Sequence, residues 1–168
     1  KLQLKDLKKY GVSYGQIEYN FGTKKYTSKS FETKIAKKFL PFRNPYPNTT
    51  LAIKKEIYIK LKGYPNLRTA EDWVFVGKLF KNLDYVPFSE EIFITADMSS
   101  DKGGMISRRH GIKILFRLIR AHYLMFRMNL YNRFIFPFAI FYQIIIRLIP
   151  FQIFKLIYKI YLTFLFKN

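Results

Sequence analysis

The last third of the chain carries a charge pattern that strongly limits what it can fold into. Residues 102–168 contain 12 Lys or Arg and no Asp or Glu, whereas residues 1–101 contain 18 basic and 11 acidic residues. The basic segment is also dense in Ile, Leu, Phe, Tyr and Met. Apolar side chains mixed with cations, and free of anions, are typical of helices on an anionic lipid surface. The sequence therefore predicts a membrane-associating tail over residues 105–168.

Spacing within the tail predicts amphipathic helices. Steps of three and four residues place a basic stripe on one helical face, made of Lys113, Arg117, Arg120, Leu124 and Arg127. Residues 152–165 repeat the design with a narrow polar stripe, made of Gln152, Lys155, Lys159 and Thr163. The longest uncharged run, residues 134–146, is interrupted by Pro137 and is shorter than the roughly 20 residues of a membrane span. We expect an interfacial or re-entrant helix there; the alternative is a helix buried in the core of a larger protein.

Composition excludes several classes of protein. The chain has no Cys and two His, which excludes a disulfide scaffold, a Cys-ligated metal centre and a His-rich one. An apolar content of 49% and an aromatic content of 19% exclude a disordered basic tail. Proteins that bind nucleic acid usually carry their cations on a polar face. The apolar setting of these cations therefore favours a membrane partner and no nucleic acid.

The first hundred residues predict a mixture of short helices and strands, as in an α/β domain, which we place at residues 1–104. A helix is expected over residues 1–10 with Gly11 as its stop, and a strand over residues 12–21. The further expectations are a polar loop (23–30), a helix capped by Ser30 (31–39), an irregular proline-rich stretch (41–47), a strand (49–53), a helical turn (54–61), a helix capped by Thr69, two strands (84–88 and 91–96) and a loop (99–104).

The first candidate for chemistry is the pair Glu71-Asp72 at the start of a predicted helix. Adjacent carboxylates point in different directions, so one can face a site while the other does not. A carboxylate near a helix N-terminus stays ionised and can accept a proton from a hydroxyl. The same two residues also suit a helix N-terminus with no further role. The local pattern leaves both interpretations open.

Two further segments carry polar side chains on distinctive backbones. Prolines stiffen the segment Asn44-Pro45-Tyr46-Pro47-Asn48-Thr49-Thr50, which can hold polar groups towards a ligand or form an ordinary turn. Glycines 103 and 104 precede Arg108 and Arg109, which suits a mobile loop that grips a phosphate or, equally, the start of the basic tail.

In order and spacing, these segments resemble a known family. The run contains Asn-Pro-x-x-Asn-x-Thr-x-x-x-Lys-Lys (44–55), Gly63-Tyr64, Glu71-Asp72-Trp73, a Leu- and Phe-rich helix, Glu91-Ile92-Phe93 and Arg108-Arg109. Over residues 30–115 it is similar to the second half of a family 2 glycosyltransferase, a bacterial enzyme class with the Rossmann-like GT-A fold. The resemblance implies the C-terminal part of a GT-A domain followed by amphipathic helices.

The resemblance also implies roles for individual residues. Asp72 would be the catalytic base of an inverting transfer, and Glu71 would orient the acceptor. The acceptor side of the cleft would be lined by Asn44, Pro45, Asn48, Thr49 and Trp73. Arg108 and Arg109 would lie near the donor diphosphate. The family often has His at the position of Asn48.

The family's nucleotide-binding half and its Asp-x-Asp metal ligands precede this region and do not occur in the chain. The resemblance therefore implies a fragment that is inactive alone and belongs to a longer protein, with Mg²⁺ or Mn²⁺ bound outside this chain. The implied partners are a nucleotide-sugar donor, a lipid-linked saccharide acceptor for surface polysaccharide, and an anionic membrane surface. The implied location is the cytoplasmic face of the bacterial inner membrane, peripheral or monotopic. The alternative is a non-enzymatic membrane-surface or scaffolding module, in which Glu71-Asp72 is a helix cap.

Overall fold

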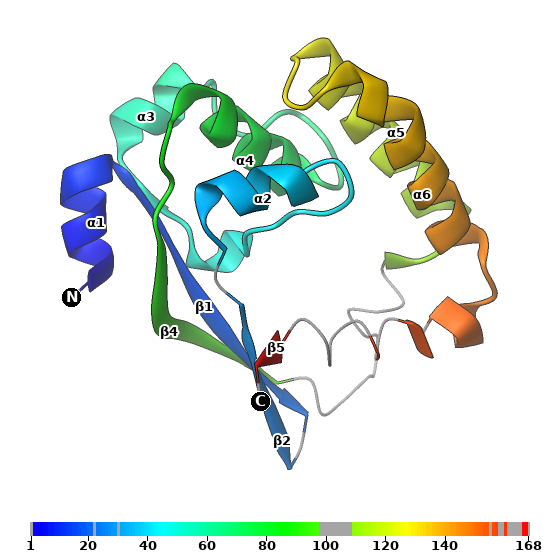
Figure 1. Ribbon diagram of the computed structural model, residues 1–168, viewed down its shortest axis with the longest axis horizontal. Helices are drawn as coiled ribbons and strands as arrows, with labels where there is room; N and C mark the ends of the chain where they lie inside the picture. The colour runs from blue at the N-terminus through cyan, green and yellow to red at the C-terminus, as the bar shows by residue number, and fades with distance from the viewer. Residues whose placement is uncertain are drawn as a thin grey trace.

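The computed structural model describes residues 2–21, 23–29, 31–97, 109–154, 156–157, 160 and 166–167. Over these residues the chain has a mixed α/β fold, which confirms the predicted class. Figure 1 shows α1 and the pair α5–α6 at opposite ends of the molecule, with the sheet and helices α2, α3 and α4 between them.

The sheet is built around β1 (Val12–Phe21), which has the predicted bounds. Along one edge, β4 (Phe88–Asp97) runs parallel to β1. Along the other, β3 (Ala52–Ile53) pairs antiparallel with the start of β1 and β2 (Lys24–Ser28) with its end. The two-residue β5 (Phe166–Lys167) extends β2 antiparallel. The sheet is therefore small and mixed.

Three predictions about where strands begin and end were wrong, in whole or in part. The predicted polar loop over 23–30 contains β2, because its polar residues form an edge hairpin with β1 and Lys25 pairs with Glu18 at 3.1 Å. Of the two strands expected at 84–88 and 91–96, residues 84–87 are not part of a strand. Strand β4 runs unbroken from Phe88 to Asp97, because register irregularities in the β1–β4 pairing absorb the expected break. The strand expected at 49–53 is present only as β3 at residues 52–53. Residues 49 and 50 belong to the 3₁₀ turn η1 (Asn48–Thr50), in which the Thr50 hydroxyl donates to the Pro47 carbonyl at 3.0 Å.

The helices follow the predicted order, with different caps. Their bounds are α1 (Leu2–Tyr10), α2 (Thr33–Phe39), α3 (Lys55–Lys60), α4 (Glu71–Asn82), α5 (Ile112–Arg127), η3 (Arg133–Ile135) and α6 (Phe136–Leu148). Gly11 ends α1 with a φ of 75°, as expected. Glu32 stands at the N-cap of α2, and Ser30 lies outside the described residues. Ala70, with a left-handed φ of 64°, stands at the N-cap of α4, so Thr69 does not cap it.

The core centres on α4. Every residue of α4 from Trp73 to Phe80 is buried. Burial extends around the whole helix because α2 and α5 both pack against it and the core continues to β1. The burial includes Lys78, whose ammonium donates to the carbonyls of Leu61 at 3.1 Å and Gly63 at 2.8 Å. Burial lowers the pKa of Lys78 because it disfavours the charged ammonium. The hydrogen bonds to the two carbonyls offset part of this cost.

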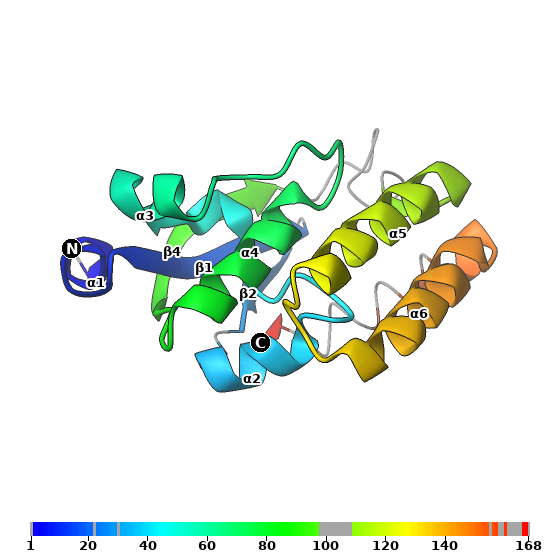
Figure 2. The same cartoon turned by 90° about the horizontal axis from the view of Figure 1, so that it is seen from above.

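The tail forms a helical hairpin, with α5 and α6 side by side in Figure 2. The four cations of the predicted basic stripe on α5 are exposed, while Leu115, Leu118, Ala121 and Met125 are buried on another face. Pro137 does not break the uncharged run; it lies in the first turn of α6, where its missing N–H costs nothing. Within the described residues, no helix combines the length and apolarity needed to cross a membrane. Much of the second predicted stripe, including Lys155, Lys159 and Thr163, lies outside the described residues.

Candidate active site

A cleft of about 590 Å³ lies where the sheet, the N-terminus of α4 and the α5–α6 hairpin meet. Its walls come from segments far apart in the sequence: the ends of β1 and β4, the Asn-Pro segment, the first turn of α4, and residues of α5 and α6. Seven of the predicted site residues line it, namely Asn44, Pro45, Asn48, Thr49, Asp72, Trp73 and Arg109. The tertiary structure thus gathers most of the predicted set in one place.

Asp72 lies in the first turn of α4 and is half-buried. The amide nitrogen of Asn44 donates to its Oδ2 at 2.9 Å. Asn44 is itself held, because its Oδ1 accepts from the backbone N–H of Tyr46 at 3.2 Å. The carboxylate is therefore fixed by the stiff Asn-Pro segment and lies at the positive end of the α4 dipole. Among the described residues that line the cleft, Asp72 is the sole acid.

Tyr64 holds the opposite end of the Asn-Pro segment. Its hydroxyl donates to Asn48 Oδ1 at 2.7 Å, so the amide of Asn48 has a fixed orientation at the cleft. Burial raises the pKa of Tyr64, which keeps this hydroxyl protonated and able to donate. Tyr64 is part of the Gly63-Tyr64 pair in the segments that resemble the glycosyltransferase family. The sequence alone does not predict its hydrogen bond to Asn48.

Positive charge lines the cleft. Arg109 is joined by Lys29, Arg43 and Arg147, which come from three different parts of the chain. Arg43 lies over the Phe39 ring at 4.9 Å, and Arg147 lies over the Phe154 ring at 5.6 Å. Sequence reasoning missed Arg43 and Arg147, because they are about a hundred residues apart and only folding brings them to one cleft. This lining suits an anionic ligand such as a phosphate.

Glu71 and Trp73 relate to the cleft differently from the other predicted residues. Glu71 is half-buried but is not among the residues that line the cleft, in keeping with the different directions of adjacent carboxylates. Trp73 forms part of the cleft wall but is only 5% exposed. Its indole N–H donates to the Leu40 carbonyl at 2.7 Å and is therefore turned to the protein interior. Arg108, like Gly103 and Gly104, lies outside the described residues.

The cleft combines a fixed carboxylate with several cations. In such a site the Asp72 carboxylate can accept a proton from the hydroxyl of a ligand, while the arginines hold an anionic group. Among the described residues, no group of three or more His, Asp or Glu side chains is placed to hold a metal ion.

In comparisons with known proteins, no family model, curated protein or solved structure matches the chain.

Proposed function

We propose that this chain forms the acceptor-binding part of an inverting glycosyltransferase of the GT-A type. In this proposal a saccharide hydroxyl binds in the cleft and gives its proton to Asp72 as its oxygen attacks the anomeric carbon of the donor sugar. The bond between that carbon and the nucleoside diphosphate breaks, and the diphosphate leaves with both bonding electrons. The configuration at the anomeric carbon inverts in one displacement.

One observation carries this proposal. Asp72, Asn44, Asn48, Thr49 and Arg109, singled out from separate stretches of sequence, line one cleft, and Asn44 bonds directly to the Asp72 carboxylate. A helix cap would not need a neighbouring asparagine or a cleft lined with cations. The arrangement suits a base beside an anionic leaving group.

The proposal assigns the remaining roles by position. Asn44 is a positioning residue for Asp72, and Tyr64 is one for Asn48. Arg43, Arg109 and Arg147 bind phosphate oxygens of the donor or acceptor. The acceptor is a lipid-linked saccharide at the cytoplasmic face of a bacterial inner membrane, and the donor is a nucleotide sugar held by a nucleotide-binding half with its metal.

The test is a transfer assay with the whole protein, as its own gene encodes it, against a panel of nucleotide sugars and a bacterial lipid extract. Asp72→Asn keeps the size and hydrogen bonding of the side chain and removes the base, so the rate should fall by about a hundredfold or more. Asp84→Asn, which alters an exposed carboxylate away from the cleft, should leave the rate unchanged.

Transfer by Asp72→Asn at the full rate would remove Asp72 as the base. A protein that transfers no sugar from any donor, and yet associates with membranes, would favour the non-enzymatic scaffolding module. In that case Glu71 and Asp72 serve the N-terminus of α4 alone.

A further inference from the structure

The exposed side of α6 carries a row of large apolar side chains. We define the aromatic row as Phe134, Phe138, Phe141, Ile145 and Leu148, with exposed fractions of 84%, 69%, 62%, 45% and 54%. Phe134 lies in η3, directly before α6, and the spacing of three and four residues places the other four along one face of α6. Soluble monomers rarely expose a continuous apolar surface of this kind, so this row needs a partner.

Cations accompany the aromatic row on the same hairpin. The exposed basic residues of this region are Lys113, Arg117, Arg120, Arg127 and Arg133. Exposed rings lie among them on α5: Phe116 is 65% exposed and Tyr123 is 51% exposed. The guanidinium of Arg127 donates to the Tyr123 hydroxyl at 3.3 Å. Since residues 102–168 contain no Asp or Glu, the exposed surface of the α5–α6 hairpin carries cations and apolar groups without carboxylates.

We propose that the exposed side of the α5–α6 hairpin lies flat on an anionic lipid bilayer. The aromatic row enters the boundary between headgroups and acyl chains, and the cations contact lipid phosphates. A second copy of the chain is a poorer occupant, because a symmetric contact would press like charges together. A bilayer satisfies both the apolar row and the charges.

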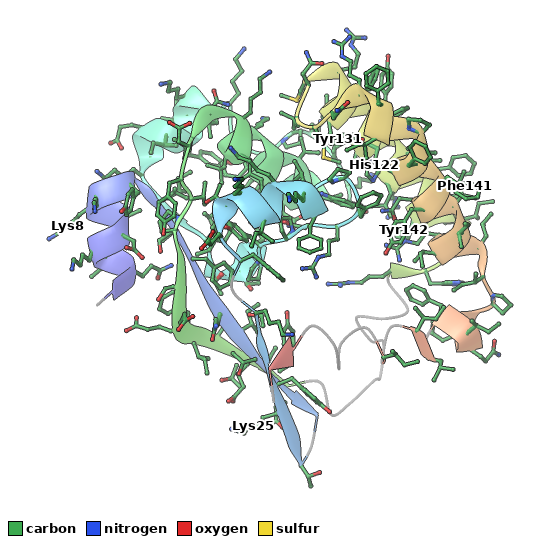
Figure 3. All side chains as sticks on the ribbon, in the orientation of Figure 1. Lys8, Lys25, His122, Tyr131, Phe141 and Tyr142 are labelled. Carbon is green, nitrogen blue, oxygen red and sulfur yellow. The ribbon has the colours of Figure 1, made fainter. Side chains whose placement is uncertain are left out.

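The placement of α6 couples this surface to the cleft. Figure 3 shows Phe141 and Tyr142 on different sides of α6, with Phe141 pointing away from the rest of the molecule. Tyr142, Ile146 and Arg147 line the cleft, while Phe141, Ile145 and Leu148 belong to the aromatic row. On a membrane-bound molecule the cleft would therefore lie close to the lipid headgroups. This inference gives the membrane partner of the proposed function a defined surface, but its test needs no sugar transfer, so either can fail alone.

Flotation of the whole protein with vesicles tests the surface. The wild type should float with vesicles of phosphatidylcholine and phosphatidylglycerol, and far less with phosphatidylcholine alone. Phe138→Ser combined with Phe141→Ser should weaken binding about a hundredfold, or about tenfold for each ring withheld from the bilayer. The matched control is Leu4→Ser with Ile59→Ser, which changes two side chains of similar exposure, on α1 and α3. This control should bind like the wild type.

A second pair of variants separates charge from apolar burial. Arg117→Gln with Arg120→Gln should weaken binding to anionic vesicles about twenty-fivefold, or roughly fivefold for each charge. Lys37→Gln with Lys38→Gln, which removes two exposed cations of α2, should have little effect. Far-ultraviolet circular dichroism establishes that all four variants are folded.

Four outcomes would overturn the proposal. The first is a wild type that floats with neither kind of vesicle, and the second is equal binding to both. The third is a concentration-dependent dimer in light scattering that the Phe138→Ser, Phe141→Ser variant abolishes, which would make the aromatic row an interface between copies. The fourth is a Phe138→Ser, Phe141→Ser variant that binds vesicles as tightly as the wild type, which would place the lipid contact elsewhere.

Discussion

His122 of α5 is fully buried, between Trp73 of α4 and Tyr131 in the connection between α5 and α6. Its ring lies in edge contact with Trp73, with centroids 4.9 Å apart, and its Nδ1 shares a hydrogen bond with the Tyr131 hydroxyl at 3.1 Å. Figure 3 shows His122 and Tyr131 near each other at this end of the molecule. Burial lowers the pKa of His122 from 6.5 to about 4 and raises that of Tyr131 to about 12. Both groups are therefore neutral at physiological pH.

The lowered pKa of His122 predicts a loss of stability in mild acid. The unfolded chain takes up a proton on His122 near pH 6.5, whereas the folded chain takes it up only near pH 4. The contribution is thus complete above pH 6.5 and is lost as the pH falls from there towards 4, by about 3 kcal/mol in total. Urea unfolding at pH 7 and pH 4.5 measures the change.

His122→Gln removes the titration and retains polar atoms for Tyr131, so its stability should depend less on pH in this range. His110→Gln, at the other histidine of the chain, should keep the dependence of the wild type. The same pH dependence in the wild type and in His122→Gln would show that other groups cause it.

At the scale of elements, the α5–α6 turn rests on α4 through Gly77. A Cβ built on Gly77 would lie 2.8 Å from Leu130 Cδ1 and 3.3 Å from Leu130 Cβ. Leu130 is buried and closely follows α5, so Gly77 lets the hairpin approach α4 closely. Gln143 adds a second link, because its side-chain amide donates to the Phe42 carbonyl at 3.0 Å. Gly77 and Gln143 therefore both help to hold the α5–α6 hairpin against the rest of the fold.

A larger side chain at position 77 should push this hairpin away. Gly77→Leu has no space beside Leu130 and should destabilise the protein by about 2 kcal/mol or more, as overpacked core sites do. Gly77→Ala is the control: the higher helix propensity of alanine, about 1 kcal/mol, opposes a much smaller clash. Thermal unfolding of both variants measures the difference, and a Gly77→Leu protein as stable as Gly77→Ala would contradict the close packing.

For the whole molecule, the dominant electrostatic property is a formal net charge of +19. Such a charge opposes the compact state through self-repulsion. With 30 Lys or Arg against 11 Asp or Glu, the cations far outnumber the carboxylates that could pair with them. The ion pair between Lys25 and Glu18 involves a largely exposed lysine. Added salt therefore weakens the repulsion among the many cations more than it weakens the attraction within ion pairs.

This balance predicts that moderate salt stabilises the fold. Raising sodium chloride from about 10 mM to about 150 mM shortens the Debye length from roughly 30 Å to about 8 Å and should raise the urea midpoint. Urea is the suitable denaturant because it is uncharged. A midpoint that falls with added salt would mean that attractive pairs outweigh the repulsion.

The sequence predicted the features that depend on neighbouring residues. The bounds of β1, the helix that ends at Gly11, the carboxylates in the first turn of α4 and the exposed cations of α5 all follow from local periodicity, turn residues and charge. Local signals failed where long-range pairing decided the outcome. The polar residues of β2 form a strand because β1 pairs with them, and β4 is continuous because its pairing with β1 accommodates an irregular register.

The candidate site divides in the same way. Residue types and their spacing are sufficient to point to Asp72, the Asn-Pro segment and Arg109. Tertiary structure decided that Asn44 bonds to Asp72, that Tyr64 orients Asn48, and that Arg43 and Arg147 join the cleft. The physical reason is range: helix periods and turns act over a few residues, whereas a cleft forms where packing brings distant segments into contact.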